Sequence, residues 1–422
     1  MLVIAGYRPR PSRPGPGRVA GIVALAASLG LVLGGCTGGT TGTTAASGAS
    51  SEATTAGTAP ASAVSEAVPA YYAEATASRS PAYDSPDNIT VRVTGTGAAL
   101  ATVRPPAPYQ SFGYVYATDS PDVWIAGAQR WHPAGQDNSA QLVTLFEVTF
   151  SPVTRKLTLT RLPAPALPGS DLAAAALSPD GGRLAVATLT PPGGGSGPHS
   201  GDVWLSVYSL AGPATAVASR ELATIPAPTV AADYALTWLD DDRTVALGGP
   251  FGPAAKAGGP NPAGVVYADG ASAALPVIRI VHLAFPAGKA SLDPATAPPR
   301  TCADPPMATA DGRLVICGGT AATTVNFGPA VNVGVWVFSA ATGRLTSTWD
   351  RHITCCAITV YPGLLWASPN GGTVVAAGLT QANEGAVLYI RAPDGHLRQI
   401  PWPGVYNDPD NPVNIVEPWV AW

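Results

Sequence analysis

Cysteine is the residue type in this chain best suited to covalent chemistry, and four of the five cysteines lie in the last third of the 422 residues. They are Cys302, Cys317, Cys355 and Cys356. Four cysteines in an oxidising compartment favour disulfides, and they allow three pairings. Cys302 with Cys317 leaves a bridge between two adjacent residues, whereas either crossed pairing joins these two to the Cys355–Cys356 segment. The sequence predicts structural disulfides and leaves their connectivity open.

A zinc site is the alternative role for these thiols, because His352 precedes Cys355 by three residues. Structural zinc sites usually contain cysteine pairs separated by about two to four residues, and this chain has none. No two of the five histidines lie three to five residues apart, and the chain contains no Gly-x-Ser-x-Gly elbow. The sequence therefore predicts no catalytic residue, no metal site and no cofactor.

Two acidic clusters carry the oxygen ligands that Ca²⁺ prefers, namely Asp240-Asp241-Asp242 and Asp408-Pro409-Asp410-Asn411. The first cluster occupies the place of a repeated hairpin turn, where Asp180 and Asp311 are its counterparts. Asp is frequent in such turns because its side chain hydrogen-bonds its own backbone. We therefore interpret the first cluster as a turn, and the second as a loop before the last strand.

The composition limits the class of protein. Only 12% of the residues are charged, compared with about 25% in an average soluble domain, and 46% are hydrophobic. A chain disordered throughout needs low hydrophobicity and high charge, so that class is excluded. The formal net charge is −4 and there is no basic footprint, so we expect no nucleic-acid partner. The 47 Gly and 44 Pro are typical of a chain with many turns.

Residues 1–35 have the features of a secretory signal. They contain four arginines and no acidic residue, and Val19 to Leu33 is an uncharged run of about 15 residues, shorter than a membrane span. The run ends in Leu33-Gly34-Gly35-Cys36, which resembles the lipobox of bacterial lipoproteins. The resemblance implies cleavage before Cys36 and lipidation of its sulfur, which would anchor the protein on the extracytoplasmic face of the bacterial cell membrane. The membrane is thus a predicted partner through that lipid.

The segment after the signal has no means of forming a core. Residues 36–68 comprise the lipidated Cys36 and a stretch rich in Thr, Ser, Ala and Gly, which predicts a flexible linker. The folded domain is expected over residues 69–422. Its apolar runs are short and separated by Gly, Pro, Asp and Asn, so we expect strands and no long helix. We also expect the Ala-rich stretches 172–176 and 231–236 to be buried strands.

A repeated pattern organises this domain: an apolar strand, a turn with Asp or Asn, and a second apolar strand. The clearest copy contains Leu177-Ser178-Pro179-Asp180-Gly181-Gly182-Arg183-Leu184. The turns recur roughly every 60 to 70 residues, longer than the about 40 to 50 of compact propeller repeats, as inserted loops would make them. The five copies span residues 114–126, 174–187, 236–247, 307–316 and 365–376.

Third and fourth strands follow several copies, and four antiparallel strands per repeat predict the blades of a β-propeller. The N-terminal part offers three strands, Tyr71 to Thr76, Ile89 to Thr94 and Ala99 to Val103, and the C-terminus offers one, Val413 to Trp422. Pairing them closes a ring and removes two free sheet edges. We therefore predict an all-β, six-bladed β-propeller, with seven blades if residues 250–300 contain another.

The Leu-Ser-Pro-Asp-Gly-Gly-Arg-Leu-Ala-Val-Ala segment resembles the signature of TolB-like and WD-repeat-like propellers, and residues 70–422 are similar to propeller lipoproteins of actinobacteria. The motif implies a fold and no particular chemistry. We expect a binding or scaffolding module for a protein or envelope ligand. The alternatives are a propeller lyase or hydrolase acting on cell-envelope polymers and a quinone-type propeller dehydrogenase. A channel lined by converging charged residues would favour an enzyme.

Overall fold

The computed structural model describes residues 68–75, 88–131, 140–168, 172–189, 202–211, 216–224, 234–251, 263–285, 302, 305–320, 330–354, 364–379, 386–401, 406–407, 415–416 and 419–422. The chain divides into two compact units, Met1–Ala61 and Ser62–Trp422, and all described residues belong to the second. These residues form strands and turns, without a helix among them. The predicted signal segment, Cys36 and the linker to residue 67 lie outside the described residues.

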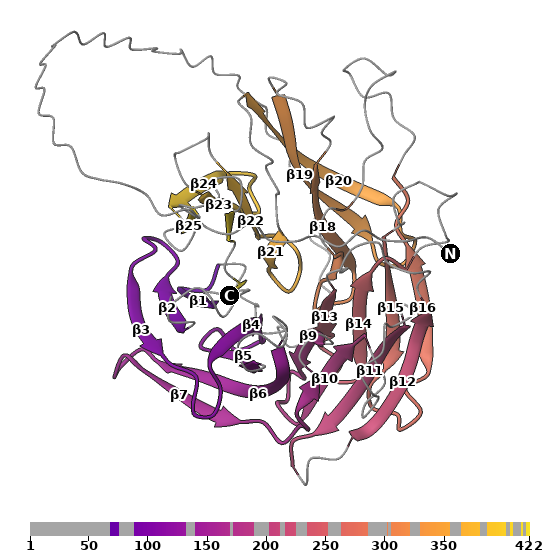
Figure 1. The fold of residues 1–422 in the computed structure, drawn as a ribbon. Helices are drawn as coiled ribbons and strands as arrows, with labels where there is room; N and C mark the ends of the chain where they lie inside the picture. Colours follow the sequence, from indigo (N-terminus) through magenta and orange to yellow (C-terminus); the bar gives the residue numbers. More distant parts are fainter. Residues whose placement is uncertain are drawn as a thin grey trace, which may run out of the picture. The chain divides into compact units, whose positions relative to one another are not determined.

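Six sheets of four consecutively paired strands make up this unit, and Figure 1 shows them following one another in sequence order. Blade 1 contains β27 (Trp419–Ala421), β1 (Tyr71–Ala75), β2 (Ile89–Val93) and β3 (Ala99–Val103). Blade 2 contains β4 (Ser111–Ala117), β5 (Val123–Trp131), β6 (Ala140–Ser151) and β7 (Lys156–Arg161), with β8 (Leu167–Pro168) paired to β6. Blade 3 contains β9 (Leu172–Leu177), β10 (Arg183–Thr188), β11 (Asp202–Ser209) and β12 (Ala216–Thr224).

The remaining blades have the same antiparallel order. Blade 4 contains β13 (Ala235–Trp238), β14 (Thr244–Gly249), β15 (Gly264–Asp269) and β16 (Val277–His282). Blade 5 contains β17 (Met307–Ala308), β18 (Leu314–Thr320), β19 (Ala330–Ser339) and β20 (Leu345–Thr354). Blade 6 contains β21 (Leu364–Ala367), β22 (Val374–Leu379), β23 (Ala386–Arg391) and β24 (Leu397–Pro401).

The first strand of each blade contacts the next blade, and these contacts close a ring. Strand β27 contacts β4, β4 contacts β9, β9 contacts β13, β13 contacts β17, β18 contacts β21, and β21 contacts β27. The strands β27, β4, β9, β13, β17 and β21 are therefore the innermost strands. A ring of radially arranged four-stranded sheets is a β-propeller, so the predicted all-β, six-bladed fold is confirmed.

The C-terminal strand completes blade 1, as predicted. It pairs antiparallel with β1, with Ala421 opposite Ala73 and Trp419 opposite Ala75. Figure 1 shows the C-terminus beside β1. Trp422 is buried, its ring stacks on Tyr72 with centroids 4.8 Å apart, and its Nε1 donates to Thr94 Oγ1 at 3.1 Å.

Hydrophobic side chains fill the spaces between successive blades. The cluster between blades 1 and 2 includes Ile89, Val91, Phe112 and Trp124, all fully buried. Small side chains occur where a ring approaches closely: the Ala-rich strand β9 packs against blade 4, and Trp238 Nε1 donates to Ala176 O at 3.1 Å. This explains why β9 is a strand although alanine favours helices, since packing decides over propensity.

Two sequence expectations need correction. Residues 250–300 contain no seventh blade in their described part, because 264–269 and 277–282 are the third and fourth strands of blade 4. The last strand covers Trp419–Ala421 and not the whole of Val413 to Trp422, because Ile415–Val416 pairs with Tyr406–Asn407 in a separate two-stranded sheet.

Candidate binding face

The turns between the first and second strands of blades 2 to 6 all lie at one end of the propeller, because the innermost strands run in the same direction. We call these turns the inner hairpins; they comprise residues 118–122, 178–182, 239–243, 309–313 and 368–372. In blade 3 the hydroxyl of Ser178 donates to the Asp180 carboxylate at 2.5 Å, and Asp180 accepts the Gly182 N–H at 2.8 Å. Gly181 has a φ of +67°, which glycine adopts without strain.

Two other inner hairpins repeat this arrangement. In blade 5 the Thr309 hydroxyl donates to Asp311 at 2.6 Å, and in blade 6 Ser368 donates to Asn370 at 2.9 Å. An amide oxygen thus replaces a carboxylate oxygen without loss of the turn. The aspartates of these turns are explained by backbone geometry, as the sequence predicts.

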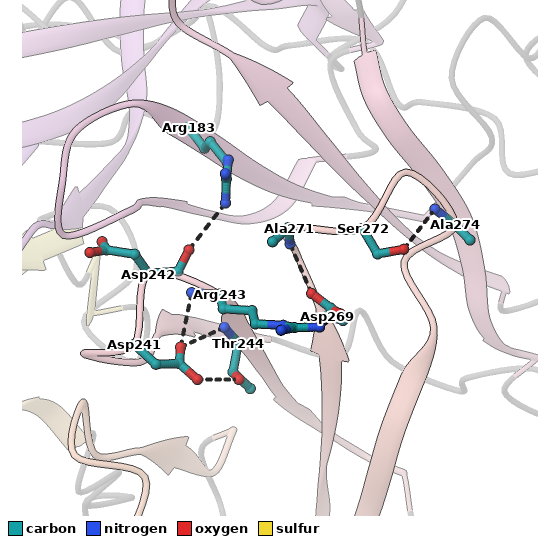
Figure 2. A network of polar contacts seen from close by, with 9 residues as sticks. All are labelled: Arg183, Asp241, Asp242, Arg243, Thr244, Asp269, Ala271, Ser272 and Ala274. Atoms are coloured by element: carbon teal, nitrogen blue, oxygen red, sulfur yellow. Dashed lines mark hydrogen bonds and ion pairs between the residues drawn. The ribbon is translucent and has the colours of Figure 1, made fainter.

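The inner hairpin of blade 4 departs from the pattern, because Leu239 stands where the others have Ser or Thr. Asp241 closes this turn by accepting the N–H groups of Arg243 at 2.9 Å and Thr244 at 2.6 Å. Asp242, with a φ of +51°, is left to bind the neighbouring blade. Its carboxylate accepts the Asp180 N–H at 2.9 Å, and its backbone oxygen accepts Nη1 of Arg183 at 3.1 Å, a contact that Figure 2 shows.

Backbone hydrogen bonds extend this connection around the ring. The Asp240 N–H donates to Ala310 O at 2.8 Å, and the Asp311 N–H donates to Pro369 O at 3.2 Å. The inner hairpins of blades 3, 4, 5 and 6 are therefore tied in series. The outer turn of blade 4 joins the same network through Arg243, which pairs with Asp269 at 2.6 Å (Figure 2).

The carboxylates of this face differ in their electrostatic state. The Ser178 hydroxyl and the Gly182 N–H hold the pKa of Asp180 below its usual value. Partial burial, with the charges of Asp311, Asp241 and Asp242, raises the pKa of Asp240. Burial and the charges of Asp240 and Asp242 raise the pKa of Asp119 to about 6. Asp119 therefore lies near blade 4, although it belongs to blade 2.

The walls of the channel contrast with this acidic end. None of the six innermost strands, all within the described residues, contains Asp, Glu, Lys, Arg or His. Their sequences are SFGYVYA, LAAAAL, ALTW, MA, LLWA and WVA. The described part of the channel thus has uncharged walls and one end surrounded by carboxylates.

The cysteines are placed only in part. Cys302 and Cys317 form a disulfide with a Cα–Cα distance of 5.6 Å, and Cys317 is fully buried in β18. Cys355 and Cys356 lie outside the described residues, as does Cys36. His352 lies in β20. In the part of the chain that the structure describes, no three His, Cys, Asp or Glu side chains are grouped to hold a metal ion, and no helix is long and apolar enough to span a membrane.

Sequence analysis missed the approach of Asp119 to Asp240 and Asp242, which come from turns about 120 residues apart. All three lie in copies of one repeated turn. Aligning the turns on the ring could have placed them at the same end of the channel.

Comparison with solved structures gives similar propellers at low identity. TolB from Acinetobacter baumannii is 14% identical with a TM-score of 0.44, over 83% of this chain and 66% of that one. A putative TolB from Agrobacterium tumefaciens is 12% identical with a TM-score of 0.40, over 78% of this chain and 87% of that one. An oligogalacturonate lyase in complex with manganese is 14% identical with a TM-score of 0.37, over 72% of this chain and 73% of that one.

This chain therefore spans just under two thirds of the length of the Acinetobacter TolB. Neither the family models nor the curated proteins that were compared give a match. These similarities are too low to assign a family or an activity, and the fold rests on the strand pairing described above.

Proposed function

We propose that this protein is a lipid-anchored, extracytoplasmic propeller that serves as a binding or scaffolding module for a protein or envelope ligand. The observation that carries the proposal is the absence of charged residues from the six innermost strands, all of them described. Acid–base and nucleophilic catalysis need titratable side chains where the substrate binds. A binding module needs only a rigid framework that presents its loops and turns.

The chemistry of the inner hairpins sets the kind of partner. Carboxylates of Asp119, Asp240, Asp242 and Asp311 surround one end of the channel, so an anionic polymer such as a nucleic acid is repelled from this face. A protein partner would present neutral or cationic groups there.

Capture of partners from intact cell envelope with the full-length protein tests this role. We expect one protein to co-purify in a fixed ratio. The variant Asp240→Asn/Asp311→Asn removes two charges, and Asp311→Asn copies the Asn370 turn of blade 6. Reduced capture by this variant would assign the binding to the inner hairpins. Failure to capture any partner, together with measurable turnover of an envelope glycan, would overturn the module in favour of the lyase or hydrolase alternative.

The extracytoplasmic location rests on two supports. The Leu33-Gly34-Gly35-Cys36 segment has the lipobox pattern, and the Cys302–Cys317 disulfide is typical of proteins in oxidising compartments. Each buried methylene of an acyl chain contributes about 0.8 kcal/mol to membrane binding, so two or three chains on Cys36 would hold the protein firmly.

The variant Cys36→Ala tests the anchor. Without the sulfur no lipid can be attached, so we expect the protein either to appear in the medium or to remain unprocessed at its full length. Cell fractionation and the mass of the membrane-bound form measure this, with Ser47→Ala in the linker as the control that stays anchored. Unchanged membrane retention of processed Cys36→Ala would refute lipid anchoring.

A further inference from the structure

Asp119 differs from the other aspartates of the inner hairpins because its carboxylate does not close its own turn. In blade 2 the Thr118 hydroxyl closes the turn by donating to Val123 O at 2.7 Å. Asp180 and Asp311 each accept a hydroxyl and an N–H group, whereas the Asp119 carboxylate accepts no hydrogen bond from the described residues. The geometry of the turn therefore does not explain the side chain of Asp119.

The surroundings of Asp119 combine access to solvent with enclosure by protein. The residue is exposed, yet enough protein surrounds its carboxyl group to raise the pKa to about 6. A side chain that water can reach but that protein encloses fits a position at the end of the central channel. There a proton from solvent can reach the carboxylate freely.

The groups that face Asp119 are negatively charged. From blade 4 these are Asp240 and Asp242, and its own turn contributes Asp122. The nearby cations have other acceptors: Arg183 donates to Asp242 O, Arg243 to Asp269, and Arg313 lies 3.9 Å from Asp311. Ionised Asp119 therefore meets like charges without a described cation beside it.

We propose that Asp119 is a proton-sensitive contact between blades 2 and 4, which draws the inner hairpins together when protonated and pushes them apart when ionised. Protonation takes one proton from solvent and turns the carboxylate into an O–H donor directed toward the carboxylates of Asp240 and Asp242. No other bond is made or broken. This device is independent of the proposed binding role.

Asp242 transmits the effect to a third blade. Its carboxylate also accepts the Asp180 N–H at 2.9 Å, which ties blade 4 to blade 3. Repulsion from ionised Asp119 acts on the same carboxylate and weakens this tie. Protonation of Asp119 therefore strengthens the connection between blades 3 and 4 as well.

The sign of the pH dependence follows from the two states of the chain. The pKa of Asp119 is about 6 in the folded protein and 3.8 in its ordinary state, so the folded protein binds the proton more tightly. The contribution of this group to stability therefore rises as the pH falls from 7 toward 4. A depressed carboxylate such as Asp180 contributes in the opposite direction.

Thermal unfolding at pH 7.5 and pH 5.0 tests the proposal on the full-length protein and two variants. Asp119→Asn cannot titrate, so we expect its gain in Tm on acidification to be smaller than that of the unaltered protein by about 2–4 °C. Asp122→Asn removes a charge from the same turn and should keep the full gain. Equal gains for Asp119→Asn and the unaltered protein would overturn the proposal.

Hydrogen exchange at the Asp180 amide gives a local readout that a general change in stability would not reproduce. After correction for the intrinsic effect of pH, we expect its protection to increase between pH 7.5 and 5.0 in the unaltered protein and in Asp122→Asn, and to stay constant in Asp119→Asn. Protection at Asp180 that is insensitive to pH in the unaltered protein would contradict the transmission through Asp242.

Discussion

Replacing Trp422 with alanine is expected to destabilise the folded domain by about 3–5 kcal/mol, the usual cost of removing a buried tryptophan. The side chain is 1% exposed, stacks on Tyr72 and donates to Thr94, so the substitution removes contacts on both sides of the ring closure. The loss is expected to be large because β27 pairs with β1 over only three residue pairs. Urea unfolding followed by tryptophan fluorescence, with far-ultraviolet circular dichroism as a second probe, measures the effect.

The variant Trp422→Phe separates the two contributions. A phenyl ring retains most of the stacking on Tyr72 but cannot donate to Thr94 Oγ1, so it should cost about 1 kcal/mol from the lost hydrogen bond. Full stability of Trp422→Ala would show that β27 does not close the ring.

Loss of the Cys302–Cys317 disulfide is expected to cost about 3 kcal/mol, because the bridge closes a loop with a sequence separation of 15. The bridge attaches the segment before β17 to the centre of β18, next to the apolar cluster between blades 4 and 5. Cys302→Ser/Cys317→Ala removes it and places no hydroxyl at the fully buried position 317.

Differential scanning calorimetry with and without a thiol reductant measures this contribution. The reductant should lower the Tm of the unaltered protein toward that of the double variant. The single variant Cys36→Ser serves as a control, because it removes a cysteine from outside the folded unit and should leave the Tm unchanged. A double variant as stable as the unaltered protein would contradict a structural role for the bridge.

The inner strands and their hairpins were predictable because the information is local. Ser178, Asp180 and Gly181 form a turn that depends on neighbouring residues alone, and each apolar strand beside such a turn needs a face to bury. The prediction even survived the Ala-rich composition of β9. Once blades of four strands were inferred, the leftover strands at the two ends implied ring closure.

Longer connections concealed other elements. The strands β15 and β16 of blade 4 follow a connection from Gly249 to Gly264 and have no Asp-Gly turn between them, so a seventh blade remained open at the sequence level. The extent of the last strand was overestimated because Ile415–Val416 pairs with Tyr406–Asn407, which local periodicity does not reveal.

The acidic end of the channel depends on relations between blades. Nothing near Asp119 in the sequence indicates that Asp240 and Asp242 face it, because this requires the number of blades and their order around the ring. The uncharged walls, in contrast, could be read from the strands once they were placed innermost. Sequence patterns thus specify each blade better than the chemistry between blades.

Closure by β27 also bears on synthesis and quality control. Trp422 and Thr94, which bond across the closure, are 328 residues apart in the sequence, so this contact forms only after nearly the whole domain has been made. A nascent chain interrupted before Trp419 leaves β1 with one unpaired edge and Tyr72 without its stacking partner. Such incomplete products present the features that proteases and chaperones recognise, namely a free strand edge and exposed apolar surface.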